Sequence, residues 1–161
     1  KVIISPEPVD ITQLTDNVQA IMNGLLYNRD LKFEVHREIP KNPYVLADVV
    51  RIREVLVNLL GNAVKFTKDG GKITLDISSY PGADEKHIIT RYVVRDNGIG
   101  MSEEAVRTIM NPQSQTGLGI AVKNVNDRLR GYYGEEAYMK IESELGVGTS
   151  VTLYLYDCAH V

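Results

Sequence analysis

Two asparagines and a lysine in the segment 48–66 are spaced to share one face of a helix. Asn58, Asn62 and Lys65 stand at positions i, i+4 and i+7, and residues three or four apart are neighbours on a helix surface. Mg²⁺ prefers hard oxygen ligands and is usually held by one or two protein groups together with substrate phosphates. An Asn oxygen can serve as such a ligand, and a lysine beside it adds positive charge for the phosphates. The spacing predicts a metal- and phosphate-binding face, whose ordinary alternative is a solvated polar helix face.

A carboxylate followed by two glycines marks a second candidate position. Asp96 follows a strand predicted over 88–95 and precedes Asn97-Gly98-Ile99-Gly100. Glycine allows backbone conformations and close approaches that other residues do not. A carboxylate at a strand end, in partly apolar surroundings, can accept a hydrogen bond from an exocyclic amine such as adenine N6. Asp/Asn-Gly is also common in hairpin turns, but the residues after Met101 predict a helix and not a returning strand, which favours a ligand-binding loop.

A third short segment, Gly117-Leu118-Gly119-Ile120, leads directly into a predicted helix. The first turn of a helix presents unpaired N–H groups and the positive end of its dipole, so phosphate is a natural ligand there. A Gly-x-Gly before a helix is otherwise an ordinary flexible turn. Neither glycine cluster matches a Walker P-loop or a dinucleotide-binding fingerprint. The three segments together predict a nucleotide site of another kind.

The elements that must position these residues follow from the periodicity of apolar residues. Asp10 is placed to cap a helix whose apolar positions Leu14, Val18, Ile21, Met22 and Leu25 form a stripe that we expect to be buried. Further helices are predicted over 48–66, briefly after Ser102, and over 117–131; strands are predicted at 2–4, 31–40, 44–47, 73–77, 88–95, 139–143 and 149–155. The predicted fold class is α+β: a mixed, mostly antiparallel sheet covered on one face by three main helices.

The composition narrows the functional class. The chain has 161 residues, 43% of them hydrophobic and 24% charged, which suits one globular domain spanning 1–161. The net charge of −3, without a basic stripe, argues against a nucleic-acid surface. No apolar run approaches membrane-spanning length. One cysteine and three scattered histidines give neither a disulfide framework nor a zinc-ligand spacing.

The ordered segments resemble the ATP-binding catalytic domain of sensor histidine kinases, within the wider group shared with gyrase, heat-shock protein 90 and mismatch-repair ATPases. Residues 58–67 resemble the family's N box, residues 96–100 its first glycine box, and residues 117–120 its second. Gly146-Val147-Gly148-Thr149 resembles the last glycine turn. The resemblance extends from about residue 10 to Tyr156, and it implies the two-layer Bergerat-type fold.

The resemblance implies a role for individual residues. Asn62 would hold Mg²⁺, Asn58 and Lys65 would contact the phosphates and support transfer, and Asp96 would bind adenine. Phe66 is left open, either against the base or in the core. The full set of implied nucleotide-binding residues is Asn58, Asn62, Lys65, Phe66, Asp96, Gly98, Gly100, Gly117, Leu118, Gly119, Ile120 and Thr149.

The implied function is transfer of the ATP γ-phosphate to a histidine on a separate dimerisation domain. Hydrolysing relatives carry a glutamate four residues before the metal-binding asparagine, whereas here that position is Asn58. Water needs a general base to attack, but a neutral imidazole already offers a lone pair. His36 lies in an alternating strand pattern and is not expected to be the acceptor, so the acceptor domain is expected to be absent from this chain. The expected downstream partner is a response regulator.

Several alternatives remain open at this point. The segment 102–116, expected to close over ATP, is short, and Thr108–Thr116 lacks the phenylalanines common there. A non-enzymatic nucleotide-sensing module is therefore one alternative, and a serine kinase of the anti-sigma-factor type or a slow ATPase of the same fold is another. Residues 124–134 resemble a different histidine-kinase branch, which leaves the subfamily open. The expected location is the cytoplasm, including the cytoplasmic part of a membrane-bound sensor.

Overall fold

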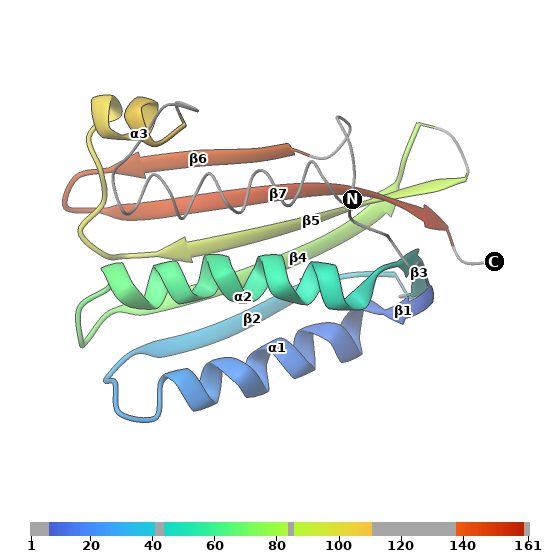
Figure 1. Ribbon diagram of the computed structural model, residues 1–161, viewed down its shortest axis with the longest axis horizontal. Helices are drawn as coiled ribbons and strands as arrows, with labels where there is room; N and C mark the ends of the chain where they lie inside the picture. The colour runs from blue at the N-terminus through green and yellow to red at the C-terminus, as the bar shows by residue number, and fades with distance from the viewer. Residues whose placement is uncertain (1–6, 41–43, 84–85, 111–137, 160–161) are drawn as a thin grey trace.

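A computed structural model describes residues 7–40, 44–83, 86–110 and 138–159. Figure 1 shows a layer of helices packed over a long sheet. The elements in chain order are β1 (Glu7–Asp10), α1 (Ile11–Leu25), β2 (Lys32–Glu38), β3 (Tyr44–Ala47), α2 (Val49–Phe66), β4 (Lys72–Pro81), β5 (His87–Asp96), α3 (Glu103–Met110), β6 (Tyr138–Glu144) and β7 (Gly148–Ala159). None of the helices in these ranges is long and apolar enough to cross a membrane.

The sheet is mostly antiparallel, with one parallel pair. Its strand order is β1-β3-β7-β5-β4-β2, and β6 pairs with β7 alongside this path. β2 and β4 run parallel, and the chain between them passes through β3 and α2. β7 pairs with three strands: β3 near its C-terminal end, β5 along most of its length, and β6 near its N-terminal end. This sheet, with α1 and α2 in one layer, confirms the predicted α+β class.

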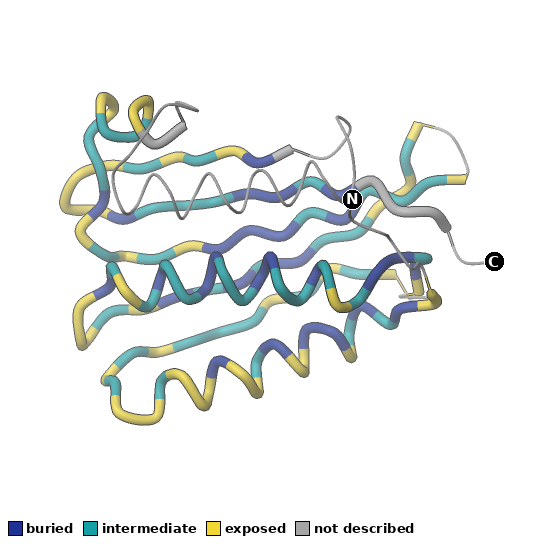
Figure 2. The backbone as a smooth tube through the Cα atoms, in the orientation of Figure 1, coloured by how far each residue is buried: buried dark blue, intermediate teal, exposed yellow. Residues whose placement is uncertain are grey.

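The core lies between the two long helices and the sheet, as the buried segments in Figure 2 show. α2 buries one side along its whole length, because Ile52, Leu56, Leu59, Leu60 and Ala63 recur at helical spacing. The sheet contributes the alternate residues of β4 and β5 that face the helices. These are Ile73, Leu75, Ile77, Tyr92 and Val94. The core therefore holds α2 against the strands whose ends carry Asp96.

α1 begins as predicted but buries a narrower stripe than expected. The Asp10 carboxylate Oδ1 accepts hydrogen bonds from the backbone N–H groups of Thr12 (2.8 Å) and Gln13 (3.2 Å), which caps the helix. Leu14, Val18 and Met22 are buried, whereas Ile21 is 38% exposed and Leu25 is 49% exposed. The prediction that Ile21 and Leu25 are buried was wrong. They lie at the margin of the apolar stripe, and β2, one of the two strands that α1 contacts, ends the sheet on that side.

Two other differences concern element positions. The strand predicted at 2–4 lies outside the described residues, and the described first strand, β1, includes Pro8. β1 ends the strand order, and proline is tolerated in edge strands because its missing N–H breaks no central ladder. The helix predicted over 117–131 also lies outside the described residues. The short helix after Ser102 is present as α3, and Ser102 Oγ caps it by accepting from Ala105 N–H at 3.1 Å.

Candidate functional site

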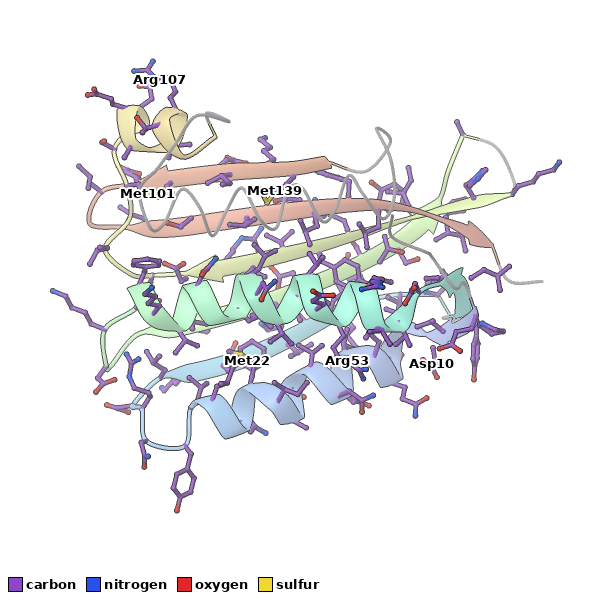
Figure 3. The ribbon with its side chains drawn as sticks, in the orientation of Figure 1. Asp10, Met22, Arg53, Met101, Arg107 and Met139 are labelled. Atoms are coloured by element: carbon purple, nitrogen blue, oxygen red, sulfur yellow. The ribbon has the colours of Figure 1, made fainter. Side chains whose placement is uncertain are left out.

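A cavity opens between the C-terminal half of α2 and the adjoining ends of β5, β6 and β7. Most of the side chains around it are apolar, and Figure 3 labels two of them, Met101 and Met139. Asp96 is the one ionisable residue among the described residues that line it. The lining consists of Leu59, Asn62, Ala63, Phe66, Val94, Asp96, Ile99, Gly100, Met101, Met139, Ile141, Thr149 and Val151. An apolar pocket with a few convergent polar groups is the usual form of a small-molecule site.

Asp96 is the last residue of β5 and is half-buried. Its Oδ1 accepts a hydrogen bond from the backbone N–H of Gly98 at 2.9 Å. Burial raises the pKa of the Asp96 carboxyl above its ordinary value, and the backbone N–H groups of Gly98 and Thr149 oppose that rise by bonding the charged form. Asp96 therefore presents a desolvated acceptor to whatever occupies the cavity.

The glycines after Asp96 are required by the protein's own packing. Gly100 has φ +67°, and a Cβ there would collide with the carbonyl oxygen of Glu144 in β6. A Cβ on Gly98 would collide with the carbonyl oxygen of Phe66 at the end of α2. The loop is thus wedged between α2 and the β6–β7 turn, where Gly146 N–H donates to Ile99 O at 2.9 Å. This packing positions the loop that follows Asp96 at the cavity wall.

The polar face of α2 is only partly at the cavity. Asn62 and Phe66 line it, whereas Asn58, one turn earlier, and the exposed Lys65 do not. Lys65 Nζ lies 5.8 Å from the centroid of the Phe66 ring. Within the part of the chain that the structure describes, the Asn62 side chain forms no hydrogen bond, so its oxygen is available to a ligand. Phe66 is half-buried at the cavity wall, a position that fits either of the two roles considered for it.

Arg29 is a site-supporting residue that the sequence did not reveal. It lies between α1 and β2, and its guanidinium reaches the C-terminal end of α2. Nη2 donates to Thr67 O at 2.7 Å, Nη1 donates to Val64 O at 3.3 Å, and Nε pairs with Asp69 Oδ1 at 2.6 Å. Because the last carbonyls of a helix lack intrahelical partners, this arginine caps the helix that carries Asn62 and Phe66. No local pattern links residues so far apart in the sequence.

The remaining predicted residues fall into two groups. Gly117, Leu118, Gly119 and Ile120 lie outside the described residues, as do residues 111–116 of the segment expected to close over ATP. His36 lies in β2, as predicted, with its Nε2 3.2 Å from Glu34 Oε2. Among the described residues, no cluster of three His, Cys, Asp or Glu side chains could hold a metal ion.

Comparisons with known proteins agree with this geometry. The sequence profile of the family described as "Histidine kinase-, DNA gyrase B-, and HSP90-like ATPase" matches residues 47–157, more than half of the chain. The virulence sensor protein BvgS of Bordetella bronchiseptica is 29% identical over 164 residues, which cover 94% of this chain and 13% of BvgS. The autoinducer 2 sensor kinase/phosphatase LuxQ of Vibrio vulnificus is 30% identical over 152 residues, which cover 87% of this chain and 17% of LuxQ.

A solved structure of similar fold contains a nucleotide analogue. The structure of full-length ShkA in complex with AMPPNP superimposes with a TM-score of 0.78 and 28% identity, covering 99% of this chain and 33% of ShkA. The part of BvgS or LuxQ that matches this chain is less than a fifth of that protein's length. The similarity extends over nearly all of this chain but over only one part of each larger protein.

Proposed function

The chain belongs to the histidine kinase-, DNA gyrase B- and HSP90-like ATPase family, and we propose that it is the ATP-binding catalytic domain of a sensor histidine kinase. The observation that carries the proposal is the half-buried Asp96 at the wall of an apolar cavity that Asn62 also lines. An apolar cavity with one desolvated hydrogen-bond acceptor suits a flat base that bears an amino group. The polar α2 face next to the cavity suits the phosphates of the same ligand.

Each site residue has a proposed role in binding ATP. Asp96 accepts from the adenine amino group, and Phe66, Gly100 and Thr149 form part of the surrounding wall. Gly98 supports the site by donating its backbone N–H to the Asp96 carboxylate. Asn62 offers an oxygen to Mg²⁺, and Asn58 and Lys65, on the same face of α2, contact phosphate. Gly117, Leu118, Gly119 and Ile120 complete the phosphate site. Mg²⁺ held by Asn62 would supply charge neutralisation for the phosphates, and the residues of the chain orient the ligand. Positioning and electrostatic stabilisation dominate catalysis of phosphoryl transfer.

The reaction is proposed to be transfer to histidine. A neutral amide at position 58 cannot abstract a proton from water, whereas an imidazole needs no such base. His36 is held in β2 beside Glu34, so the acceptor is proposed to come from a dimerisation domain outside this chain, with a response regulator as the next partner. We propose these partners and a cytoplasmic location from the resemblance to sensor kinases, and a single domain spanning 1–161 from the length and composition of the chain.

The proposal is tested by binding and by transfer. The 161-residue chain should bind Mg·ATP and be stabilised by it, by about 2.7 kcal/mol at a hundredfold excess over Kd. It should label a supplied histidine-kinase dimerisation domain from γ-labelled ATP and release phosphate only slowly. Binding without transfer would favour the nucleotide-sensing module, and rapid phosphate release would favour the ATPase. Label retained on this chain but lost in His36→Ala would show that the proposed acceptor is wrong.

A further inference from the structure

Three residues stand side by side where β5, β7 and β6 reach the cavity. Asp96 of β5 is the direct cross-strand partner of Thr149 of β7, and Thr149 is the direct partner of Ser143 of β6. Residues directly opposite each other on neighbouring strands point to the same face of a sheet. Asp96 and Thr149 line the cavity, so the side chain of Ser143 lies on the same face, one strand further from Asp96.

The Ser143 hydroxyl makes three polar contacts, which together fix the direction of every bond. Its Oγ lies 2.8 Å from Met101 N, 2.9 Å from Gly148 O and 2.8 Å from Thr149 Oγ1. A hydroxyl has one proton and two lone pairs. The backbone N–H of Met101 can only donate, and the carbonyl of Gly148 can only accept. Ser143 therefore donates to Gly148 O, accepts from Met101 N–H, and has one lone pair left for Thr149.

This arrangement determines what Thr149 offers to the cavity. All three contacts are hydrogen bonds only if the Thr149 hydroxyl donates its single proton to Ser143. Its remaining lone pairs are then acceptors. The carboxylate of Asp96 next to it is also an acceptor, and its backbone donors are Gly98 and Thr149. The two polar groups on this wall thus accept hydrogen bonds and offer no donor.

We propose that Ser143 is a positioning residue that determines specificity. By accepting the hydroxyl proton of Thr149, it leaves only hydrogen-bond acceptors on the wall beside Asp96, and this wall therefore selects a ligand that presents an amino group there. This inference rests on the proposed nucleotide-binding function and adds how the base is chosen. A carbonyl at the same place would face two acceptors and leave buried groups unpaired, and such mismatches discriminate more strongly than a missing contact does. Ser143 acts through Thr149 and does not itself contact the ligand.

The test compares ATP with ITP, whose base has a carbonyl where adenine has its amino group. The wild-type chain should prefer ATP. In Ser143→Ala the Thr149 hydroxyl is free to rotate and donate into the cavity, so the preference should fall by about tenfold. Ser143→Thr keeps the hydroxyl and should keep the preference. Thr149→Val removes the hydroxyl and should reduce the preference for ATP over ITP similarly. Adding Ser143→Ala to Thr149→Val should cause no further change in the ratio of the Kd values for ATP and ITP.

The alternative is that Ser143 only supports the β6–β7 turn. In that case Ser143→Ala would weaken the binding of ATP and of ITP equally and leave the ratio of the two Kd values unchanged, or it would change this ratio further when added to Thr149→Val. Either result overturns the proposal. If Ser143→Ala does not fold, Thr149→Val alone decides, because an unchanged ratio in that variant also overturns it. A wild-type chain that binds both nucleotides equally would refute this inference, together with the role of Asp96 toward the amino group, and would leave ATP binding itself standing. A chain that binds neither nucleotide would refute the proposed function.

Discussion

Replacing Asp96 with asparagine removes the negative charge from the cavity wall and leaves the shape of the cavity unchanged. The variant side chain keeps its size, and its oxygen can still accept from Gly98 N–H, which lies 2.9 Å from Oδ1. It loses the charged acceptor proposed for the adenine amino group and gains an N–H₂ donor. A hydrogen bond to a charged group contributes about 1.5–3 kcal/mol. Asp96→Asn should therefore weaken ATP binding by roughly 10- to 100-fold, while GTP, which presents a carbonyl, should gain relative to ATP.

In the absence of nucleotide, the same substitution should stabilise the fold relative to the wild type. Burial raises the pKa of Asp96 in the folded chain above its ordinary value of 3.8, so the folded chain holds this proton to a higher pH than the unfolded chain does. The free energy of unfolding of the wild type therefore decreases as the pH rises from about 3.8 through the folded pKa, and this loss is complete above it. Asp96→Asn has no such titration. Relative to the wild type, its melting temperature should rise with pH through this window.

The two effects are measured by calorimetric titration with ATP and GTP, and by thermal melting without nucleotide from pH 4 to pH 8, the range around the titration of a buried carboxyl. A variant that bound ATP as tightly as the wild type would refute the assignment of Asp96 to the base. A melting-temperature difference that did not change with pH would refute the desolvation argument. The combination expected here, weaker binding with a more stable empty fold, is typical of a site residue whose burial is unfavourable without its ligand.

Three further predictions test the surroundings of the cavity. Asn62→Ala should weaken Mg²⁺-dependent ATP binding and leave adenosine binding largely unchanged, which titrations with and without Mg²⁺ would show. An unchanged Mg²⁺ dependence would mean that this helix face is only solvated. Arg29→Ala leaves the carbonyl of the buried Thr67 without its hydrogen-bond donor and should lower the free energy of unfolding by about 1–3 kcal/mol. In thermal melting Arg29→Lys should be intermediate, and an unaltered melting temperature of Arg29→Ala would contradict the capping role. Gly61→Ala should stabilise α2 by about 0.5–1 kcal/mol, because its Cβ would meet nothing within 4 Å. Gly148→Ala should destabilise the fold, because Gly148 has φ +140° and its Cβ would collide with Asp96 O. Equal melting temperatures for these two glycine variants would contradict this difference in packing.

Sequence patterns predicted the elements well wherever local chemistry defines them. The strand Tyr44–Ala47 and the cap at Asp10 were both predicted, because an alternating run and a capping side chain are visible within a few residues. The burial of Ile21 and Leu25 was predicted wrongly, since helical periodicity does not reveal where the sheet ends. The position of Pro8 within β1 depended in the same way on that strand being an edge.

The candidate site was predictable in part, for a similar reason. Asp96 and Asn62 were singled out by type and spacing, and the fold brings both to one cavity. Arg29 and Ser143 were not singled out, because each acts through contacts that only the folded chain creates. Arg29 caps a helix from a separate loop, and the contacts of Ser143 join β6 to β7 and to the loop after Asp96. Their residue types alone carry no signal for these positions.

The central place of β7 also has a consequence for the order in which the chain folds. β7 is the last described strand along the sequence, yet it lies between β3 and β5 in the sheet. During synthesis the β1–β3 pair and the β5–β4–β2 ladder emerge first and cannot join until β7 inserts between them; such non-local pairing is slow. Until then β5 has an open edge, which can associate with other chains. Asp96 gains Thr149 opposite it only at that step, so the competence to bind a ligand arises together with completion of the sheet.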